Sequence, residues 1–172
     1  ELLRHKLYQV DFLTTQSGEA LVTLIYHKPL TDDWVAKAKT LKQQLGIDIV
    51  GRSRKQRLLV ERDHVIERMQ VLGRDYFYQQ VEASFTQPNA GVCQSMLSWA
   101  VENSKGFGGD LLELYCGNGN FTLPLAQNFS KVLATEVSKT SVDSAHYNIA
   151  RNKIENIQIA RMSSEEFSQA MD

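Results

Sequence analysis

The order of apolar and polar positions in the first half of the chain predicts one helix between two pairs of strands. Residues 7–13 and 20–27 are rich in β-branched and aromatic residues and are separated by a turn with Gly18, so they predict a hairpin. Apolar residues then recur at helical spacing and two further β-rich runs follow. This order predicts a small α/β domain with its helix on one face of a sheet. The helical positions and the last two runs are Trp34, Ala38, Leu41, Leu45, 47–52 and 58–60.

The second half of the chain alternates between strand and helix periods. Residues 75–85 predict a further hairpin-like element, Pro88 ends it, and Asn89 can cap the next helix. The alternation that follows is typical of a parallel Rossmann-like sheet built from βαβ units. Three strands are fewer than such a sheet normally has, so we expect this one to be truncated. The expected strands are 111–114, 132–135 and 157–161, and the expected helices are 121–129 and 140–152.

These two halves predict two α/β domains, over residues 1–75 and 76–172. The chain has 172 residues of which 42% are hydrophobic, which is enough for a core in each domain. No apolar run approaches the roughly 18 residues of a transmembrane helix. Two cysteines, Cys93 and Cys116, fit a reduced cytoplasmic protein better than a disulfide scaffold.

Several polar residues and one thiol predict structure rather than chemistry. Cys93 falls on the apolar stripe of its helix, so we interpret it as a core thiol. The four histidines have no ligand spacing, so we expect no metal site. A row of asparagines at i, i+4 and i+8 is typical of helix caps and turns. The row consists of Asn148, Asn152 and Asn156.

The formal charge of −1 hides an asymmetry along the chain. Residues 1–80 hold 13 Lys and Arg against 10 Asp and Glu, whereas residues 81–172 hold 6 against 10. Four of the cations in the first half cluster at Arg52, Arg54, Lys55 and Arg57. The cluster fits either a solvated edge strand or a surface that contacts phosphates. Aromatic rings on the neighbouring strands either stack on an unpaired base or pack locally. The candidate RNA contacts are Tyr8, His27, Arg52 and Arg54.

The strongest motif is a strand that leads through a glycine-containing turn into a helix. In open α/β sheets, ligands bind beyond the carboxyl ends of the strands, where this turn lies. Gly117 and Gly119 let the backbone bend tightly and let a ligand approach closely. Glu136 ends the next strand, 17 residues after Gly119, and a carboxylate there can accept both hydroxyls of a ribose. The motif therefore predicts a ligand that contains adenosine.

The other turn residues favour a methyl donor over a dinucleotide. A dinucleotide fingerprint needs a third glycine, and that position holds Thr122. Glu113 ends the first strand and would repel a pyrophosphate, whereas it suits the cationic groups of S-adenosylmethionine. We therefore expect S-adenosyl-L-methionine as the cofactor.

Three segments together resemble the RNA uracil-5-methyltransferase family, and most closely its members that act on tRNA. They are Phe85-Thr-Gln-Pro-Asn, Leu112-Glu-Leu-Tyr-Cys-Gly-Asn-Gly-Asn-Phe and Ala134-Thr-Glu. The resemblance covers all 172 residues. It implies an RNA-recognition-like small domain, and as substrate a uridine in the T arm of tRNA that becomes ribothymidine. With the glycine turn, it implies cofactor contacts at Gln87, Tyr115, Gly117, Asn120 and Glu136.

The resemblance also implies two catalytic groups that the chain does not contain. The chemistry needs a cysteine thiolate that adds to C6 of uracil and a glutamate base that removes the proton from C5. Both are expected C-terminal to Asp172, the thiolate in a Ser-Cys-Asn-Pro string. Cys116 lies in the cofactor turn and is not expected to be the nucleophile. We therefore expect these residues alone to be inactive.

Three alternatives remain open at this stage. A ribosomal RNA uracil-5-methyltransferase would share the fold, although such enzymes commonly carry a cluster of iron–sulfur cysteines towards the N-terminus. An NAD-dependent oxidoreductase would need the third glycine of the turn. A noncatalytic RNA-binding protein could keep the fold without the chemistry.

Overall fold

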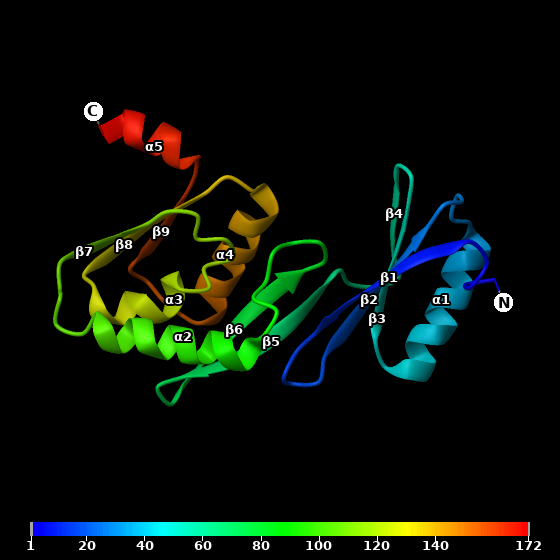
Figure 1. Cartoon of the computed structure of the whole chain (residues 1–172), viewed down its shortest axis with the longest axis horizontal. Helices are drawn as coiled ribbons and strands as arrows, with labels where there is room; N and C mark the ends of the chain where they lie inside the picture. The colour runs from blue at the N-terminus through cyan, green and yellow to red at the C-terminus, as the bar shows by residue number, and fades with distance from the viewer. Residues whose placement is uncertain (1, 172) are drawn as a thin grey trace. The chain divides into compact units, whose positions relative to one another are not determined.

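The computed structural model describes residues 2–171 and divides into two compact units, Glu1–Val65 and Ile66–Asp172 (Figure 1). We call them the first and the second unit. Within the described residues, no helix is long and apolar enough to cross a membrane. The elements are β1 (Leu7–Thr14), β2 (Ala20–Tyr26), α1 (Asp32–Leu45), β3 (Asp48–Ser53), β4 (Gln56–Leu59), β5 (His64–Val71), β6 (Arg74–Val81), α2 (Ala90–Asn103), β7 (Asp110–Glu113), α3 (Thr122–Leu125), a 3-10 turn (Ala126–Asn128), β8 (Lys131–Glu136), α4 (Lys139–Arg151), β9 (Ile157–Arg161) and α5 (Ser164–Met171).

The first unit is a four-stranded sheet with α1 along one face (Figure 1). Strands β1 and β2 are antiparallel, β2 and β3 are parallel, and β3 and β4 are antiparallel. The parallel pair is joined through α1, because parallel neighbours need a crossover connection. The predicted order of strand, strand, helix, strand, strand is therefore confirmed.

Helix α1 begins and ends where its sequence provides caps. The Thr31 side chain accepts a hydrogen bond from the Trp34 backbone N–H, and Gly46 ends the helix with a left-handed φ of 66°. Trp34 is only 1% exposed. Its ring lies over Gly51 of β3, where an added Cβ would overlap it. The prediction that Trp34 belongs to the core is confirmed.

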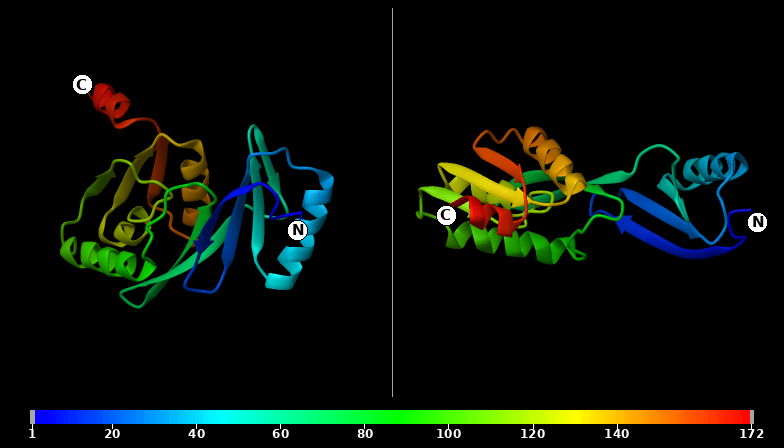
Figure 2. Two further views of the ribbon diagram at one scale, coloured as in Figure 1. Left: turned by 45° about the vertical axis from the view of Figure 1, so that its right-hand side comes forward. Right: turned by 90° about the horizontal axis from the view of Figure 1, so that it is seen from above.

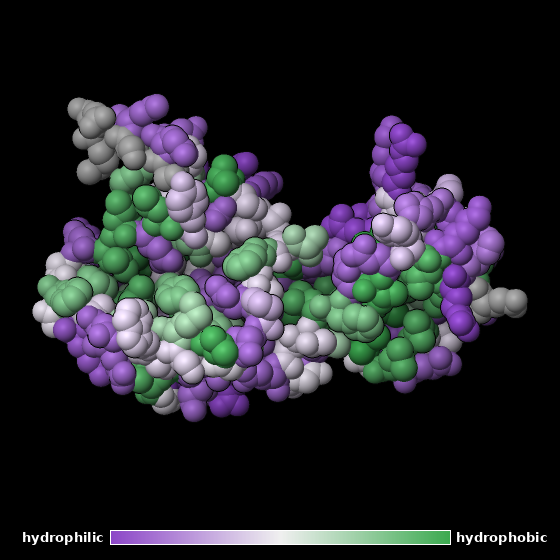
Figure 3. All heavy atoms as spheres, viewed as in Figure 1, coloured by the Kyte–Doolittle hydropathy of each residue, from purple (hydrophilic) through white to green (hydrophobic). Residues whose placement is uncertain are grey.

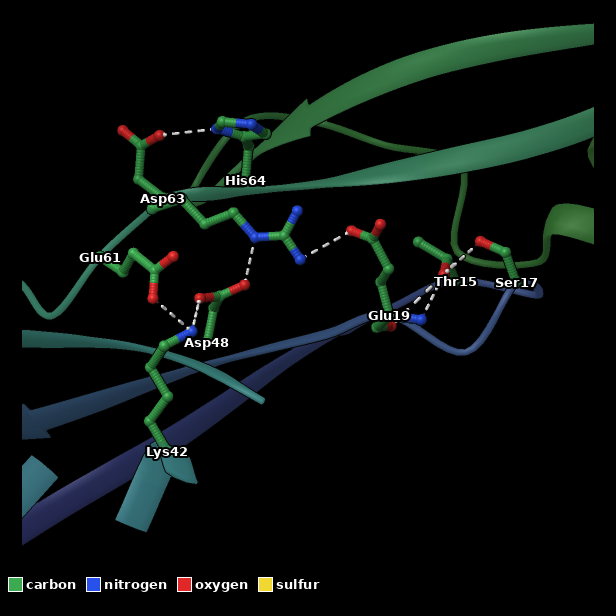
Figure 4. Close-up of polar contacts among 9 residues, drawn as sticks. Thr15, Ser17, Glu19, Lys42, Asp48, Glu61, Asp63 and His64 are labelled. Atoms are coloured by element: carbon green, nitrogen blue, oxygen red, sulfur yellow. Dashed lines mark hydrogen bonds and ion pairs between the residues drawn. The ribbon is translucent and has the colours of Figure 1, made fainter. Parts of the chain in front are cut away.

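An ion-pair network lies near the C-terminal end of the first unit (Figure 4). Its centre is the buried carboxylate of Asp48, which pairs with Lys42 at 2.6 Å and with Arg62. Glu61 accepts from Lys42, and Glu19 accepts from Arg62. Burial alone would raise the pKa of Asp48, but the hydrogen bonds from Lys42 and Arg62 hold it below its ordinary value. The network thus ties the segment around residue 61 to the sheet.

The second unit combines the hairpin β5–β6 with a parallel sheet of order β7-β8-β9. Helix α4 packs against β6, β8 and β9, and α5 contacts β8 (Figures 1 and 2). Apolar side chains gather over β7 and β8 in Figure 3. Leu112 and Leu114 are among the exposed large apolar residues of this unit. The predicted alternation of parallel strands and helices is confirmed.

The hairpin lies earlier in the chain than the sequence predicted, at 64–81 instead of 75–85. Its buried residues, among them Met69, Tyr76 and Tyr78, pack with Cys93 and Leu97 of α2 in one core. The structure therefore divides between Val65 and Ile66, whereas the sequence placed the boundary between residues 75 and 76. The difference arises because the hairpin contributes its apolar face to the second unit.

Candidate functional site

The turn between β7 and α3 has a backbone that few side chains tolerate. Tyr115, Gly117 and Gly119 have left-handed φ angles of 58°, 58° and 83°. A Cβ at Gly119 would lie 2.6 Å from Leu123 Cδ1, whereas a Cβ at Gly117 would meet nothing within 4 Å. Gly119 is therefore required by packing. Gly117 leaves open space beside the backbone that a ligand can approach.

The carboxylate of Glu136 joins this turn to the next loop. Glu136 Oε2 accepts the Gly117 N–H at 3.0 Å, and Oε1 accepts the Ser138 N–H at 2.7 Å. An ionised carboxylate has about four acceptor sites, so both oxygens can still accept hydroxyls. The structure thus brings together the glycine turn and the acid that the sequence singled out.

The other predicted cofactor residues lie around the turn in different ways. Asn120 donates from Nδ2 to Cys93 Sγ at 3.1 Å, so the core thiol also holds a turn residue. Tyr115 is 65% exposed. Gln87 is half-buried in the segment between β6 and α2, and within residues 2–171 no hydrogen bond ties it to the turn.

Two asparagines have partners that the sequence pattern did not indicate: Asn148 lies within α4, and Asn152 is the C-cap of that helix. Asn148 is completely buried; its Oδ1 accepts the Gln79 N–H at 2.6 Å and its Nδ2 donates to the Asn118 carbonyl at 2.9 Å. Asn152 hydrogen-bonds both backbone groups of Phe77, at 2.9 and 2.7 Å. Asn152 is the C-cap of α4, as the asparagine pattern predicted, and it also links the helix to β6. Interpreting Asn148 as a cap or turn residue was wrong, because it lies inside α4 and links the helix to β6 and to the glycine turn. The available signal was that Asn148 follows Ala145 by three positions, on the apolar face of its helix.

Glu113 is a half-buried residue at the start of the turn, and its Oε2 atom is buried. Its Oε2 and the Thr122 hydroxyl have no hydrogen-bond partner among the described residues. Burial raises the pKa of Glu113 to about 7, and the neighbouring Thr122 hydroxyl opposes the shift only in part. A buried carboxylate that lacks a partner is a favourable place for a cationic group. The turn therefore fits the charge of S-adenosylmethionine.

Cys116 is unsuited to nucleophilic attack. Burial, followed by the carboxylates of Glu113 and Glu136, raises the pKa of this thiol to about 12. The thiolate is the reactive form of cysteine. Cys116 is thus protonated at neutral pH.

The four candidate RNA residues meet at one hollow of the first unit. Tyr8, His27, Arg52 and Arg54 line this hollow of about 800 Å³, together with residues such as Lys28. The rings of Tyr8 and His27 are 4.2 Å apart and inclined by 64°. Tyr8 still exposes 65% of its surface, so local packing leaves much of the ring accessible.

The cation cluster that the sequence suggested separates in the structure. Arg52 and Arg54 lie in the hollow, whereas Arg57 donates to Asp63 at 2.8 Å. Lys55 occupies the turn between β3 and β4 with a φ of 64°. Arg52 lies on β3, Arg54 and Lys55 lie in the turn that follows, and Arg57 lies on β4, so the four cations belong to different parts of this hairpin.

Comparisons with known proteins agree along the whole chain. The family model described as tRNA (Uracil-5-)-methyltransferase matches residues 1–172. A tRNA/tmRNA (uracil-C(5))-methyltransferase of Cellvibrio japonicus is 69% identical over the whole chain, and one of Saccharophagus degradans is 59% identical. The chain spans 47% of the length of each of these curated relatives.

Solved structures share the fold at low sequence identity. A crystal structure of Pyrococcus abyssi tRNA (uracil-54, C5)-methyltransferase in complex with S-adenosyl-L-homocysteine has a TM-score of 0.65 and 16% identity. It covers 87% of this chain, which corresponds to 37% of that one. The family model and the two curated relatives establish the identification: the chain belongs to the tRNA (uracil-5-)-methyltransferase family.

Proposed function

We propose that the protein with this chain transfers a methyl group from S-adenosyl-L-methionine to C5 of a uracil in tRNA. The observation that carries the proposal is the glycine turn, which Glu136 holds and beside which Glu113 lacks a partner. The curated relatives are named for tRNA and tmRNA, and the Pyrococcus abyssi enzyme for uracil-54. The finer proposal is the uridine at position 54 in the T arm, converted to ribothymidine.

In this proposal the second unit binds the cofactor, which supplies the methyl group. Glu136 accepts the ribose hydroxyls, and Glu113 faces the cationic end of the ligand. The open side of Gly117 lets the ligand approach the backbone. Tyr115, Asn120 and Gln87 complete the contacts, as the family resemblance implies.

In the same proposal the first unit holds the tRNA. The hollow combines two arginines with a largely exposed tyrosine ring, which suits phosphates and an unstacked base respectively. We place the protein in the cytoplasm, where tRNA is available and the free thiols of Cys93 and Cys116 stay reduced.

The catalytic groups belong to the proposal as well. The described residues offer no activated thiol for attack on C6, since the pKa of both cysteines is raised by burial. We place the nucleophilic cysteine and the glutamate base C-terminal to Asp172. The 172 residues by themselves would then bind substrates without turnover.

The test is methyl transfer by the protein at its full natural length. Radiolabelled S-adenosylmethionine is offered with unmodified tRNA, tmRNA or ribosomal RNA, and the product nucleoside is identified by mass spectrometry. We expect 5-methyluridine in tRNA, lost when the T-arm uridine is replaced by cytidine. Methylation of ribosomal RNA alone would favour the ribosomal enzymes, and RNA binding without methylation would favour a noncatalytic RNA-binding protein.

A further inference from the structure

Along one edge of strand β6, backbone N–H and C=O groups bond to side chains instead of to a neighbouring strand. Its partner in the hairpin is β5. At Phe77 and Gln79 the backbone N–H and C=O groups bond to asparagines. Buried backbone groups must find partners, because an unpaired one costs free energy comparable to a lost hydrogen bond. The asparagines thus take the place of a missing strand.

Two of these asparagines, Asn118 and Asn148, tie the glycine turn to β6 through a closed ring of three hydrogen bonds. The Gln79 N–H donates to Asn148 Oδ1 at 2.6 Å, and Asn148 Nδ2 donates to the Asn118 carbonyl at 2.9 Å. Asn118 Nδ2 donates back to the Gln79 carbonyl at 3.2 Å. The Tyr78 hydroxyl donates to the Asn120 carbonyl at 3.0 Å. Strand β6 and helix α4 therefore hold the backbone on both sides of Gly119.

These bonds fix the part of the turn that is intrinsically most mobile. Gly117 and Gly119 populate left-handed conformations, but glycine also has many others to choose from. Asn148 is completely buried, so its amide has no competing water. Removal of its donor would leave the Asn118 carbonyl unsatisfied. The peptide before Gly119 would then lose one of its bonds and keep the one from the Gly119 N–H to the Cys116 carbonyl.

We propose that Asn148 is a positioning residue for the cofactor and sets the orientation of the glycine turn through Asn118. The inference rests on the proposed binding of S-adenosylmethionine at this turn. Strand β6 holds the turn in place through the hydrogen bonds of Gln79 and Tyr78. Asn148 acts on the turn backbone and needs no contact with the ligand.

The experiment compares two isosteric substitutions on α4 in the protein at its full natural length. Asn148→Asp keeps the acceptor for the Gln79 N–H but removes the donor to the Asn118 carbonyl. Asn152→Asp is the matched control, because it removes donors to the carbonyls of Phe77 and Asn148 and does not touch the turn. We expect both variants to lower the melting temperature. Only Asn148→Asp should weaken S-adenosylmethionine binding in calorimetry, by roughly tenfold.

Steady-state kinetics distinguishes a role in positioning the cofactor from a general loss of structure. Asn148→Asp should raise KM for S-adenosylmethionine by about the same factor, while KM for tRNA and kcat at saturating cofactor stay near wild type. Tyr78→Phe removes the bond to the Asn120 carbonyl with little change in volume. It should also weaken cofactor binding selectively, and it carries the test if Asn148→Asp does not fold.

Two outcomes would overturn the inference alone while wild-type protein binds the cofactor. One is an equal loss of affinity in Asn148→Asp and Asn152→Asp. The other is unchanged affinity in both Asn148→Asp and Tyr78→Phe. A wild-type protein that does not bind S-adenosylmethionine would instead overturn the proposed function, and this inference with it.

Discussion

At the scale of single residues, burial decides which polar groups carry chemistry. Glu113 and Glu136 end neighbouring parallel strands, yet their environments differ. Glu136 accepts hydrogen bonds from two backbone N–H groups. Glu113 Oε2 is buried without a partner, so its charged form is penalised. The two carboxylates therefore suit different parts of one ligand: hydroxyls for Glu136 and a cation for Glu113.

The raised pKa of Glu113 predicts a pH-dependent stability difference. Its pKa is about 7 in the folded state against 4.5 for an ordinary glutamate, so the folded state holds the proton more tightly. The contribution of this group to stability is present below about pH 4.5 and is lost as the pH rises to about 7. Relative to wild type, Glu113→Gln should therefore gain about 2 to 3 kcal/mol in unfolding free energy between pH 5 and pH 8.

Urea unfolding at both pH values measures this difference. Glu155→Gln, at an exposed glutamate of the same unit, is the control and should show no such gain. A gap between Glu113→Gln and wild type that does not change with pH would contradict the predicted titration.

The role of Glu136 predicts a selective loss of cofactor affinity. Hydrogen bonds from ribose hydroxyls to a carboxylate contribute roughly 1.5 to 3 kcal/mol. Glu136→Ala should therefore weaken binding of S-adenosylmethionine by about tenfold to a hundredfold in calorimetric titration. NAD is titrated in parallel, and tighter binding of NAD than of S-adenosylmethionine would favour an oxidoreductase instead.

At the scale of elements, the place of a cation in the hairpin of β3 and β4 decides which surface it lines. Arg57 is neutralised by Asp63 at 2.8 Å, whereas Arg52 and Arg54 lie at the hollow with Tyr8. Whether a cation lines the hollow thus depends on its place in the hairpin of β3 and β4. Membership of the cation cluster along the sequence does not decide it.

The hollow predicts how RNA binding depends on salt. A double substitution Arg52→Ser with Arg54→Ser should weaken tRNA binding and lower the slope of log K against log salt by about 1.5, since each phosphate contact contributes roughly 0.7 to 0.9. Lys37→Ser with Lys39→Ser removes the same charge from α1, where both lysines are exposed. Filter binding over a range of salt concentrations should show a smaller change for this control. Equal slopes for the two double variants would exclude the hollow as the RNA contact.

At the scale of the whole molecule, two units with separate cores carry separate parts of the proposed function. The first unit has a core around Trp34 and the second has a core around Tyr76 and Tyr78. In the proposal, each unit carries the residues that bind its own ligand: tRNA for the first unit and S-adenosylmethionine for the second. In the proposal, the nucleophile and the base lie outside this chain.

This division predicts binding without turnover for the 172 residues alone. They should bind S-adenosylmethionine more weakly than the protein at its full natural length, because the described sheet β7-β8-β9 has three strands, fewer than a doubly wound sheet normally has. They should form no 5-methyluridine in tRNA. Calorimetry and nucleoside analysis check the two statements, and methylated uridine made by this chain alone would show that the dismissal of Cys116 was wrong.

The sequence by itself determined the element order and the glycine turn, because these depend on local periodicity, caps and backbone preferences. Asn89 caps the helix that the sequence assigned to it. The residues Gly117 and Glu136 could be paired from sequence, since the carboxyl ends of neighbouring parallel strands meet at one edge.

Only the tertiary structure decided the partners of buried polar groups. The apolar face of α4 indicates that Asn148 is buried, but it does not indicate that Asn148 holds β6 and the glycine turn. In the same way, the sequence does not indicate that Asn156 donates to the carbonyls of Ala126 and Phe129. The membership of β5–β6 in the second unit was likewise set by packing against α2. Such contacts join residues far apart along the chain, so they depend on how whole elements dock and not on the pattern within any one of them.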